Sequence, residues 1–315
     1  MAELGKLNSA FLCSRMFKNG QIITLQCAET LTFKTFQKND MQGNNAIGIF
    51  DSGFGGLTVF KAIAEKLPNY NYIYLGDNAR SPYGDHSFDT VYRYTLECVE
   101  WLFEQGCPLV ILACNTASAK ALRNIQQLDL PKKYPNCKVL GVIRPTAEVV
   151  GEMSKTKSIG VLGTRGTIRS ESYLIEINKF FPDVEVYQQS CPMWVPLVEN
   201  NEHEYPGADY FVKKYIDAIM QQSPNIDTLL LACTHYPLLI NKISNYVNSN
   251  IKLISQGEIV ANSLKDYLGR HLEIESKLSK NNKQLFYTTG DLSTFNDHAS
   301  VFLGRALQAK PMHEK

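Results

Sequence analysis

From Ile47 onward, short apolar runs alternate with longer stretches in which apolar residues recur every three or four positions. Short apolar runs are typical of buried strands, and the longer period is typical of helices that pack on a sheet. The sequence predicts strands at 47–50, 72–75, 109–113, 138–142, 159–162, 184–188, 228–232, 251–254 and 285–288. Alternation of strands with helices in this order favours an α/β fold with parallel pairing.

The sequence also indicates where two of the helices begin and end. In residues 57–67 the apolar side chains recur on one face, as in a helix that packs on a sheet. Ser87 is a favourable N-cap residue ahead of a second stretch with the same period. Gly106 can adopt the left-handed conformation that often ends a helix, so we expect the second helix to lie between these two residues.

Two parts of the chain resemble each other. The segment 109–116, LVILACNT, is similar to 229–234, LLLACT, and their cysteines are 233 − 114 = 119 residues apart. The segments that begin at Ile47 and Ile159 are also similar, and their separation is 159 − 47 = 112 residues. Two separations of similar size indicate two halves built on one plan. The predicted fold is therefore α/β, with two pseudo-symmetric lobes, each a mostly parallel sheet flanked by helices, and an active site in the cleft between them.

This plan predicts three regions of the chain. The first lobe would comprise residues 46–142 together with 255–309, and the second lobe residues 143–254. Residues 1–45 read as polar and without a clear period, so we expect a poorly ordered N-terminal extension. Met41 lies directly ahead of the first strand, and translation from this residue is a further hypothesis. A length of 315 residues suits two domains of ordinary size.

Composition excludes several classes of partner and cofactor. The 32 basic residues nearly balance the 31 acidic ones, and no basic stripe is interleaved with aromatic residues, so we expect no nucleic-acid partner. No apolar run approaches the roughly 18 residues of a membrane span, and a signal peptide is not evident, which predicts a cytoplasmic protein without a membrane partner. The eight cysteines include no C-x-x-C pair, so we expect free thiols and no metal site.

Cys114 and Cys233 each follow an apolar strand and precede a small polar residue. A single free cysteine is usually a small buried hydrophobic residue. At the start of a helix, however, the helix dipole lowers the pKa of a thiol. The duplicated setting favours chemistry, because two equivalent half-sites would present two thiols to one cleft. One thiolate could remove an α-proton from an amino acid while the other thiol protonates the opposite face of the planar intermediate.

Two further segments carry candidate groups for this chemistry. Residues 51–56, DSGFGG, form a glycine-rich turn between a predicted strand and helix, whose backbone N–H groups could bind a small anion. The turn matches neither a phosphate-binding loop nor a dinucleotide fingerprint. Asp51 could bind an ammonium group, assist a thiol, or cap the following helix. His235 lies two residues after Cys233 and could act as an acid, a base or a carboxylate donor.

With these residues the chain resembles the glutamate racemases of the aspartate/glutamate racemase superfamily, from about Ile47 to Gly304. The resemblance implies a cofactor-independent interconversion of L- and D-glutamate that supplies D-glutamate for peptidoglycan. The matching stretches are Asp51–Gly53 with Gly55–Thr58, Gly76–Asp77, Pro82–Gly84, Ala113–Ala117, Gly163–Thr164, Val195–Glu199, Ala232–Leu238 and Tyr287–Asp291. The N-terminal extension, Arg144 and Arg169 depart from the pattern of the family and leave the reaction class unchanged.

The resemblance also implies roles for individual residues. Cys114 would take the proton from the D-enantiomer and Cys233 from the L-enantiomer, while Asp51 and His235 attend the thiols and Glu199 assists. The substrate would be held by a set of residues that act largely through their backbone groups in the loops: Asp51, Ser52, Pro82, Tyr83, Gly84, Asn115, Thr116, Thr146, Thr234 and His235. Without the resemblance, Tyr83 would be read as an ordinary turn tyrosine and Glu199 as a surface carboxylate.

Three alternatives stay open. An aspartate or hydantoin racemase of the same superfamily would use the same two thiols, although the run CTHYP at 233–237 favours glutamate. A related decarboxylase would need only one of the thiols. A non-catalytic amino-acid-binding homologue would have no reason to keep all of Asp51, Cys114, Cys233 and His235. The family commonly forms homodimers, and the sequence does not select an arrangement of subunits.

Overall fold

The computed structural model describes residues 45–313, which contain two parallel sheets. The predicted N-terminal extension up to residue 44, and the proposed start at Met41, lie outside the described residues. A six-stranded sheet has the order β10-β9-β2-β1-β3-β4, and a four-stranded sheet has the order β6-β5-β7-β8. Their strands are β1 (Ile47–Asp51), β2 (Tyr72–Gly76), β3 (Leu109–Leu112), β4 (Lys138–Gly141), β5 (Ser158–Gly163), β6 (Glu185–Ser190), β7 (Thr228–Ala232), β8 (Lys252–Ile254), β9 (Gln284–Thr288) and β10 (Lys310–Pro311).

All nine predicted strands are present, with ends within two residues of the predicted ones. The prediction missed β10, which has only two residues, Lys310 and Pro311, and therefore carries no apolar run or period that could indicate a strand. It pairs with β9 at the edge of the six-stranded sheet, where a proline is tolerated.

The two sheets repeat one plan. The order β2-β1-β3-β4 in the larger sheet is matched by β6-β5-β7-β8 in the smaller one, and every pair is parallel. Phe50 lies opposite Leu112 near the carboxyl ends of β1 and β3, as Leu162 lies opposite Leu231 in β5 and β7. This repetition confirms the predicted α/β class with two related halves, whereas the lobe boundaries at 142 and 255 stay predictions.

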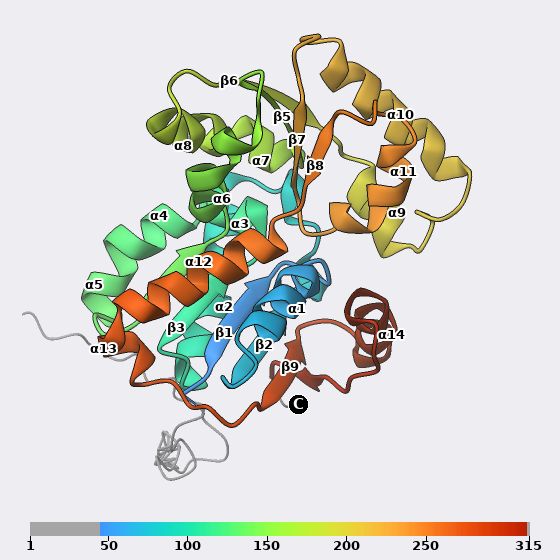
Figure 1. Cartoon of the computed structure of the whole chain (residues 1–315). Helices are drawn as coiled ribbons and strands as arrows, with labels where there is room; N and C mark the ends of the chain where they lie inside the picture. The colour runs from blue at the N-terminus through green and yellow to red at the C-terminus, as the bar shows by residue number, and fades with distance from the viewer. Residues whose placement is uncertain (1–44, 314–315) are drawn as a thin grey trace, which may run out of the picture. The chain divides into compact units, whose positions relative to one another are not determined.

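Helices flank both sheets, and Figure 1 shows α1 and α12 side by side on one face of the six-stranded sheet. Their bounds are α1 (Leu57–Lys66), α2 (Phe88–Glu104), α3 (Asn115–Lys120), α4 (Leu122–Asn124), α5 (Leu130–Lys133), α6 (Ile143–Val150), α7 (Arg165–Arg169), α8 (Ser172–Phe180), α9 (Trp194–Glu199), α10 (Gly207–Met220), α11 (Ile240–Ser244), α12 (Gly257–Arg270), α13 (Leu272–Glu275) and α14 (Leu292–Leu303). None of the helices between Asn45 and His313 is long and apolar enough to cross a membrane.

The two helices bounded from the sequence are confirmed. Helix α1 buries Leu57, Phe60 and Ile63 on the face that the period predicted. Helix α2 begins after Ser87, whose side chain accepts a hydrogen bond from the backbone N–H of Thr90. The chain leaves α2 through Gly106, at a φ of 85°, in the left-handed region that favours glycine.

The apolar core explains why the site lies at the ends of strands. Strands β1, β2, β3, β5 and β7 are fully buried, so their backbone and side chains are held by sheet and helix on all sides. Polar side chains then cluster where these strands end. In open parallel sheets, ligands bind at such carboxyl ends, where the order of strands reverses. Here the reversal occurs at β1 and β3 in one sheet and at β5 and β7 in the other.

Candidate active site

Cys114 lies at the carboxyl end of β3 and caps the first turn of α3. Its Sγ accepts a hydrogen bond from the backbone N–H of Ala117 at 3.4 Å and lies 3.4 Å from Ser52 Oγ. Burial, and then the charge of Asp51, raise the pKa of Cys114 to about 12, although the contacts with Ser52 and Ala117 act in the opposite direction. Near neutral pH this residue is therefore a thiol that can donate a proton.

Cys233 lies at the carboxyl end of β7 and has a different partner. Its Sγ is 3.9 Å from Nδ1 of His235, and Nε2 of the same ring is 3.1 Å from Oε1 of Glu199. Burial alone would lower the pKa of His235, but the hydrogen bonds to Cys233 and Glu199 outweigh it and raise the value to about 10. Burial would raise the pKa of Glu199, yet His235 holds it below its ordinary value. An imidazolium beside the sulfur can stabilise negative charge there.

Asp51 lies between the two half-sites as the last residue of β1, and it is fully buried. Its Oδ1 accepts a hydrogen bond from the backbone N–H of Gly53 at 3.0 Å, and its Oδ2 accepts one from Thr234 Oγ1 at 3.4 Å. Burial raises the pKa of Asp51, and the charge of His235 opposes this. The N-cap residue of α1 is Gly56, and the Asp51 carboxylate interacts with the backbone N–H groups of Gly53 and Gly56 in the turn that leads into this helix. The roles of Asp51 toward a thiol and a bound ammonium group stay predictions.

The glycine-rich turn after β1 meets the segment after β7 at close range. A Cβ atom on Gly55 would lie 2.4 Å from Thr234 Oγ1 and 2.5 Å from His235 Nδ1. Thr58 Oγ1 also donates a hydrogen bond to the backbone oxygen of Thr234 at 3.0 Å. Only a residue without a side chain fits at this position, so the glycine of the turn brings Asp51 and His235 into one site.

The predicted substrate loops meet on the Cys114 side of the site. Thr116 Oγ1 lies 2.9 Å from Thr164 Oγ1, and a Cβ atom on Gly84 would lie 2.9 Å from the Cβ of Thr164. Tyr83 is buried, and its hydroxyl donates to the carboxylate of Asp77, which leaves the backbone of the loop for a ligand. Pro82 is exposed beside it. The substrate contacts themselves stay a prediction.

Asn115 and Thr146 belong to a buried network that the sequence did not reveal. Gln256, between β8 and α12, accepts from Asn115 Nδ2 at 2.8 Å and lies 2.9 Å from Thr146 Oγ1 and 2.5 Å from the Tyr173 hydroxyl. The Tyr173 hydroxyl lies 2.5 Å from Asn115 Oδ1. Both ends of the Asn115 amide are thus occupied, so a substrate would meet the backbone of this residue. No local pattern marks Gln256 or Tyr173, because their partners are distant in the sequence.

Ser81 is a third residue of the site, besides Gln256 and Tyr173, that was not among the predicted ones. Its Oγ donates a hydrogen bond to Glu199 Oε1 at 3.3 Å, the oxygen that also contacts His235. A signal was available, because Ser81 directly precedes the matching stretch Pro82–Gly84.

A pocket of about 540 Å³ adjoins Cys233 and Thr234 on one side. Thr58 and Val59 of α1 and the segment 252–259 form much of its lining, whereas Cys114 is not among the lining residues. Both cysteines are 6% exposed.

The other cysteines in the described part of the chain have no comparable setting. Cys98, Cys107 and Cys191 are buried, Cys137 is half-buried, and none of the four forms a disulfide. Burial raises the pKa of all four thiols. Their burial and raised pKa values favour packing over chemistry as the role of these four cysteines.

Curated proteins resemble this chain over most of its length. A glutamate racemase of Enterococcus faecalis is 38% identical over 275 residues, which cover 87% of this chain and 97% of that protein. A glutamate racemase of Sulfurihydrogenibium sp. is 40% identical over 260 residues, which cover 82% of this chain and 94% of that protein.

Solved structures share the fold. A glutamate racemase isoform from Bacillus anthracis superimposes with a TM-score of 0.76 at 34% identity, over 84% of this chain and 96% of that one. The glutamate racemase of Francisella tularensis, solved in complex with D-glutamate, gives a TM-score of 0.74 at 31% identity, over 85% and 96% of the two chains. Residues 47–264, more than half of the sequence, match the family described as Asp/Glu/Hydantoin racemase, and the chain therefore belongs to that family.

Proposed function

We propose that this protein is a glutamate racemase, in which Cys114 and Cys233 exchange the α-proton from opposite faces of the substrate. One observation carries the proposal: the two sulfurs occupy equivalent positions in a duplicated plan, directly after β3 and β7. Asp51 lies close to both half-sites, because its carboxylate accepts a hydrogen bond from Thr234, the residue after Cys233, and its charge acts on Cys114. The choice of glutamate rests on the relatives, which are glutamate racemases that cover most of the chain.

For L-glutamate, the sulfur of Cys233 takes the α-proton as a thiolate, so that the C–H bond breaks and an S–H bond forms. His235, an imidazolium held by Glu199, stabilises the negative charge on this sulfur before the transfer. The Cys114 thiol then gives its proton to the opposite face of the planar α-carbon, which yields D-glutamate and a Cys114 thiolate. The reverse reaction begins from that state, with Cys114 as the base.

The binding of the substrate and the biological role extend this proposal. Backbone N–H groups after β1 and at the start of α3 would hold the α-carboxylate and stabilise the carbanion, each donor being worth about 3 kcal/mol. Because both cysteines are 6% exposed, entry of the substrate would require the loops around them to separate. A role in supplying D-glutamate for peptidoglycan, a cytoplasmic location and a homodimer complete the proposal.

Incubation with each glutamate enantiomer in deuterated water, without added cofactor, tests the reaction. We expect racemisation together with α-proton exchange. Cys114→Ser should stop racemisation but keep exchange of the α-proton of L-glutamate, because Cys233 still faces it. Cys233→Ser should show the mirror-image result with D-glutamate. Cys137→Ser, at a half-buried cysteine remote from these contacts, is the matched control and should retain full activity.

Three outcomes would contradict the proposal. Substantial racemisation by either Cys114→Ser or Cys233→Ser would remove that residue from its role as a base. Activity that depends on added pyridoxal phosphate would overturn the mechanism. Racemisation of aspartate in place of glutamate would overturn the substrate.

A further inference from the structure

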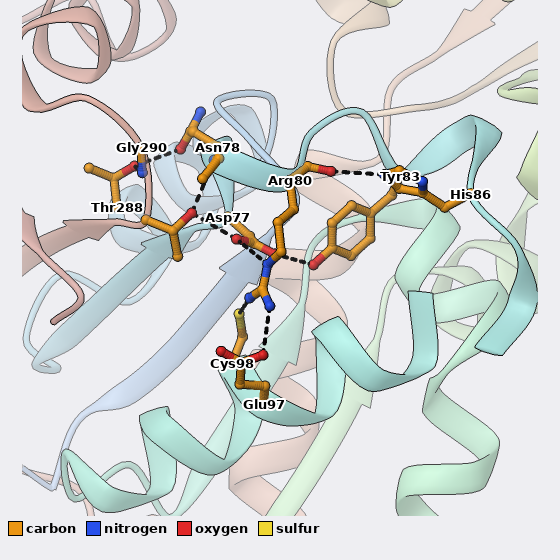
Figure 2. A network of polar contacts seen from close by, with 11 residues as sticks. Asp77, Asn78, Arg80, Tyr83, His86, Glu97, Cys98, Thr288 and Gly290 are labelled. Atoms are coloured by element: carbon orange, nitrogen blue, oxygen red, sulfur yellow. Dashed lines mark hydrogen bonds and ion pairs between the residues drawn. The ribbon is translucent and has the colours of Figure 1, made fainter. Parts of the chain in front are cut away.

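The loop that follows β2 begins beside Asp51 and is fixed by a buried carboxylate (Figure 2). The backbone N–H of Asp77 donates to the backbone oxygen of Asp51 at 3.0 Å, and the Asp77 side chain is fully buried. That carboxylate accepts from Arg80 Nε at 2.7 Å, from Thr289 Oγ1 at 2.7 Å and from the Tyr83 hydroxyl. Asp77 directly follows β2, so its hydrogen bonds attach the side chains of Arg80 and Tyr83 to the end of a strand of the six-stranded sheet.

Arg80 fixes the same loop to α2. Its guanidinium forms an ion pair with Glu97 at 2.6 Å and lies over the ring of Tyr94, 4.3 Å from the centroid. The backbone oxygen of Arg80 is 3.0 Å from Nε2 of His86. A guanidinium shared between two carboxylates and an aromatic face has a single favourable orientation, since its donors are held in a rigid plane. The backbone that enters Ser81 is therefore held in place.

The hydroxyl of Ser81 reaches across to the other half of the site. It donates to Glu199 Oε1 at 3.3 Å, and the same oxygen lies 3.1 Å from His235 Nε2. A Cβ atom on Gly53 would lie 3.2 Å from both Glu199 Oε1 and Ser81 Oγ, so the turn after β1 closes this contact from a third side. The side chain of Glu199 is 19% exposed, and Ser81 and His235 both contact its Oε1, so the serine hydroxyl adds a second constraint on the direction of the carboxylate.

We propose that Ser81 is a positioning residue for the second thiol, acting through Glu199 and His235 on Cys233, in a loop that the Asp77–Arg80 pair holds rigid. The expected effect of Ser81 on racemisation kinetics rests on the proposed function. The orientation of the Glu199 carboxylate toward the His235 imidazole does not depend on the substrate.

Several charged groups act on His235 and must be considered in a test. Glu199 and Cys233 contact its two ring nitrogens, and Asp51 interacts with it by charge from the end of β1. His298 of α14 interacts with Glu199 from a further side. Burial would raise the pKa of Glu199, whereas hydrogen bonds from His235 and Ser81 lower it. Ser81 Oγ and His235 Nε2 contact the same oxygen, Glu199 Oε1, so the serine hydroxyl fixes the direction in which the carboxylate points. Without this contact the carboxylate should turn away from the imidazole, and the loss of orientation should weaken the pair.

The test compares Ser81→Ala with Ser81→Thr, which keeps the hydroxyl. The first variant should lower kcat about tenfold, the worth of one hydrogen bond to a charged group, with little change in KM. The second should restore most of the activity. Ser87→Ala is the matched control, because Ser87 caps α2 in the same region without contacting the site. It should lower stability and leave kcat unchanged.

A double-mutant cycle with Glu199→Gln shows whether the effect passes through the carboxylate. If it does, Ser81→Ala should change kcat less than about twofold in the Glu199→Gln background. A full tenfold loss in that background would overturn the inference, as would a rise in KM with kcat unchanged.

An NMR titration of the His235 ring in the free protein separates this inference from the proposed function. Ser81→Ala should lower the pKa of His235, while Ser87→Ala should leave it unchanged. An unchanged or higher pKa in Ser81→Ala would overturn the inference. A lowered pKa in a protein that does not racemise glutamate would retain the positioning role and refute the proposed function.

Discussion

The most direct test of the site geometry is the substitution Gly55→Ala. The new methyl group would lie 2.4 Å from Thr234 Oγ1 and 2.5 Å from His235 Nδ1, where ordinary van der Waals contact begins at 3.4 Å. Each of these atoms would have to move by about 1 Å, because 3.4 − 2.4 = 1.0 and 3.4 − 2.5 = 0.9. A displacement of about 1 Å at a catalytic group costs about a hundredfold in rate, or ~2.7 kcal/mol of transition-state stabilisation.

The assay is kcat/KM for racemisation in both directions. L- and D-glutamate have equal free energies in water, so the equilibrium constant is one and kcat/KM must fall by the same factor in each direction. Gly269→Ala in α12 is the control, since no atom lies within 4 Å of the added methyl group. It should stabilise the helix by up to about 1 kcal/mol and leave the kinetics unchanged. Gly55→Ala with at least a third of the wild-type kcat/KM and an unchanged Tm would refute the reasoning.

Three further predictions concern groups whose partners the structure defines. Burial alone would raise the pKa of Asp227, but hydrogen bonds such as that from Ser154 at 2.6 Å outweigh it and lower the pKa to about 2. The ionised carboxylate therefore stabilises the fold fully above pH 3.8, and this contribution is lost as the pH falls toward 2. Urea unfolding of Asp227→Asn should give a free energy of unfolding about 1 kcal/mol below that of the wild type at pH 7, allowing for solvent screening. An unchanged free energy of unfolding would contradict the stabilising role of this carboxylate. The pKa of His235 is raised from 6.5 to about 10, so its charge stabilises the fold fully below pH 6.5 and this contribution disappears as the pH rises to 10. The difference in unfolding free energy between wild type and His235→Asn should therefore shrink over that window, and a difference that is constant or grows would refute the assignment. Gln256→Met leaves the buried Nδ2 of Asn115 without its acceptor and should lower the unfolding free energy by about 2 kcal/mol, whereas a change under about 0.5 kcal/mol would mean that water replaces the bond.

Much of the fold could be read from local patterns. Strands β1, β2, β3, β5 and β7 are apolar runs whose burial follows from their composition. Ser87 and Gly106 bound α2 through their own backbone preferences. The edge strand β10 escaped detection because its two residues gain their pairing from β9 and carry no pattern of their own. The pairing of β10 with β9 arises only once the sheet has formed, so residues 310–311 carry no local signal of it.

Some residues of the candidate site could likewise be predicted from local patterns, and others could not. Cys114 and Cys233 could be singled out because the plan of strands repeats and places each cysteine after an equivalent strand. Gln256 and Tyr173 could not, since their hydrogen-bond partners are 141 and 58 residues away in the sequence. Ser81 adjoins a stretch that matches the family, but its partner Glu199 is 118 residues away and only the fold brings the two together. A serine or glutamine in a loop has many uses, and only its neighbours in space select one.

Nine of the ten strands in the described residues, the repeated strand plan and the pair of thiols could be predicted without the structure, because they depend on side-chain periodicity and on residues close together in the chain. The tertiary structure alone decided how the two half-sites differ. Cys114 is a buried thiol beside Ser52 and Asp51, while Cys233 faces an imidazolium held by Glu199. Ionisation depends on burial and on charges that reach the site from distant segments, and neither quantity exists before the chain has folded.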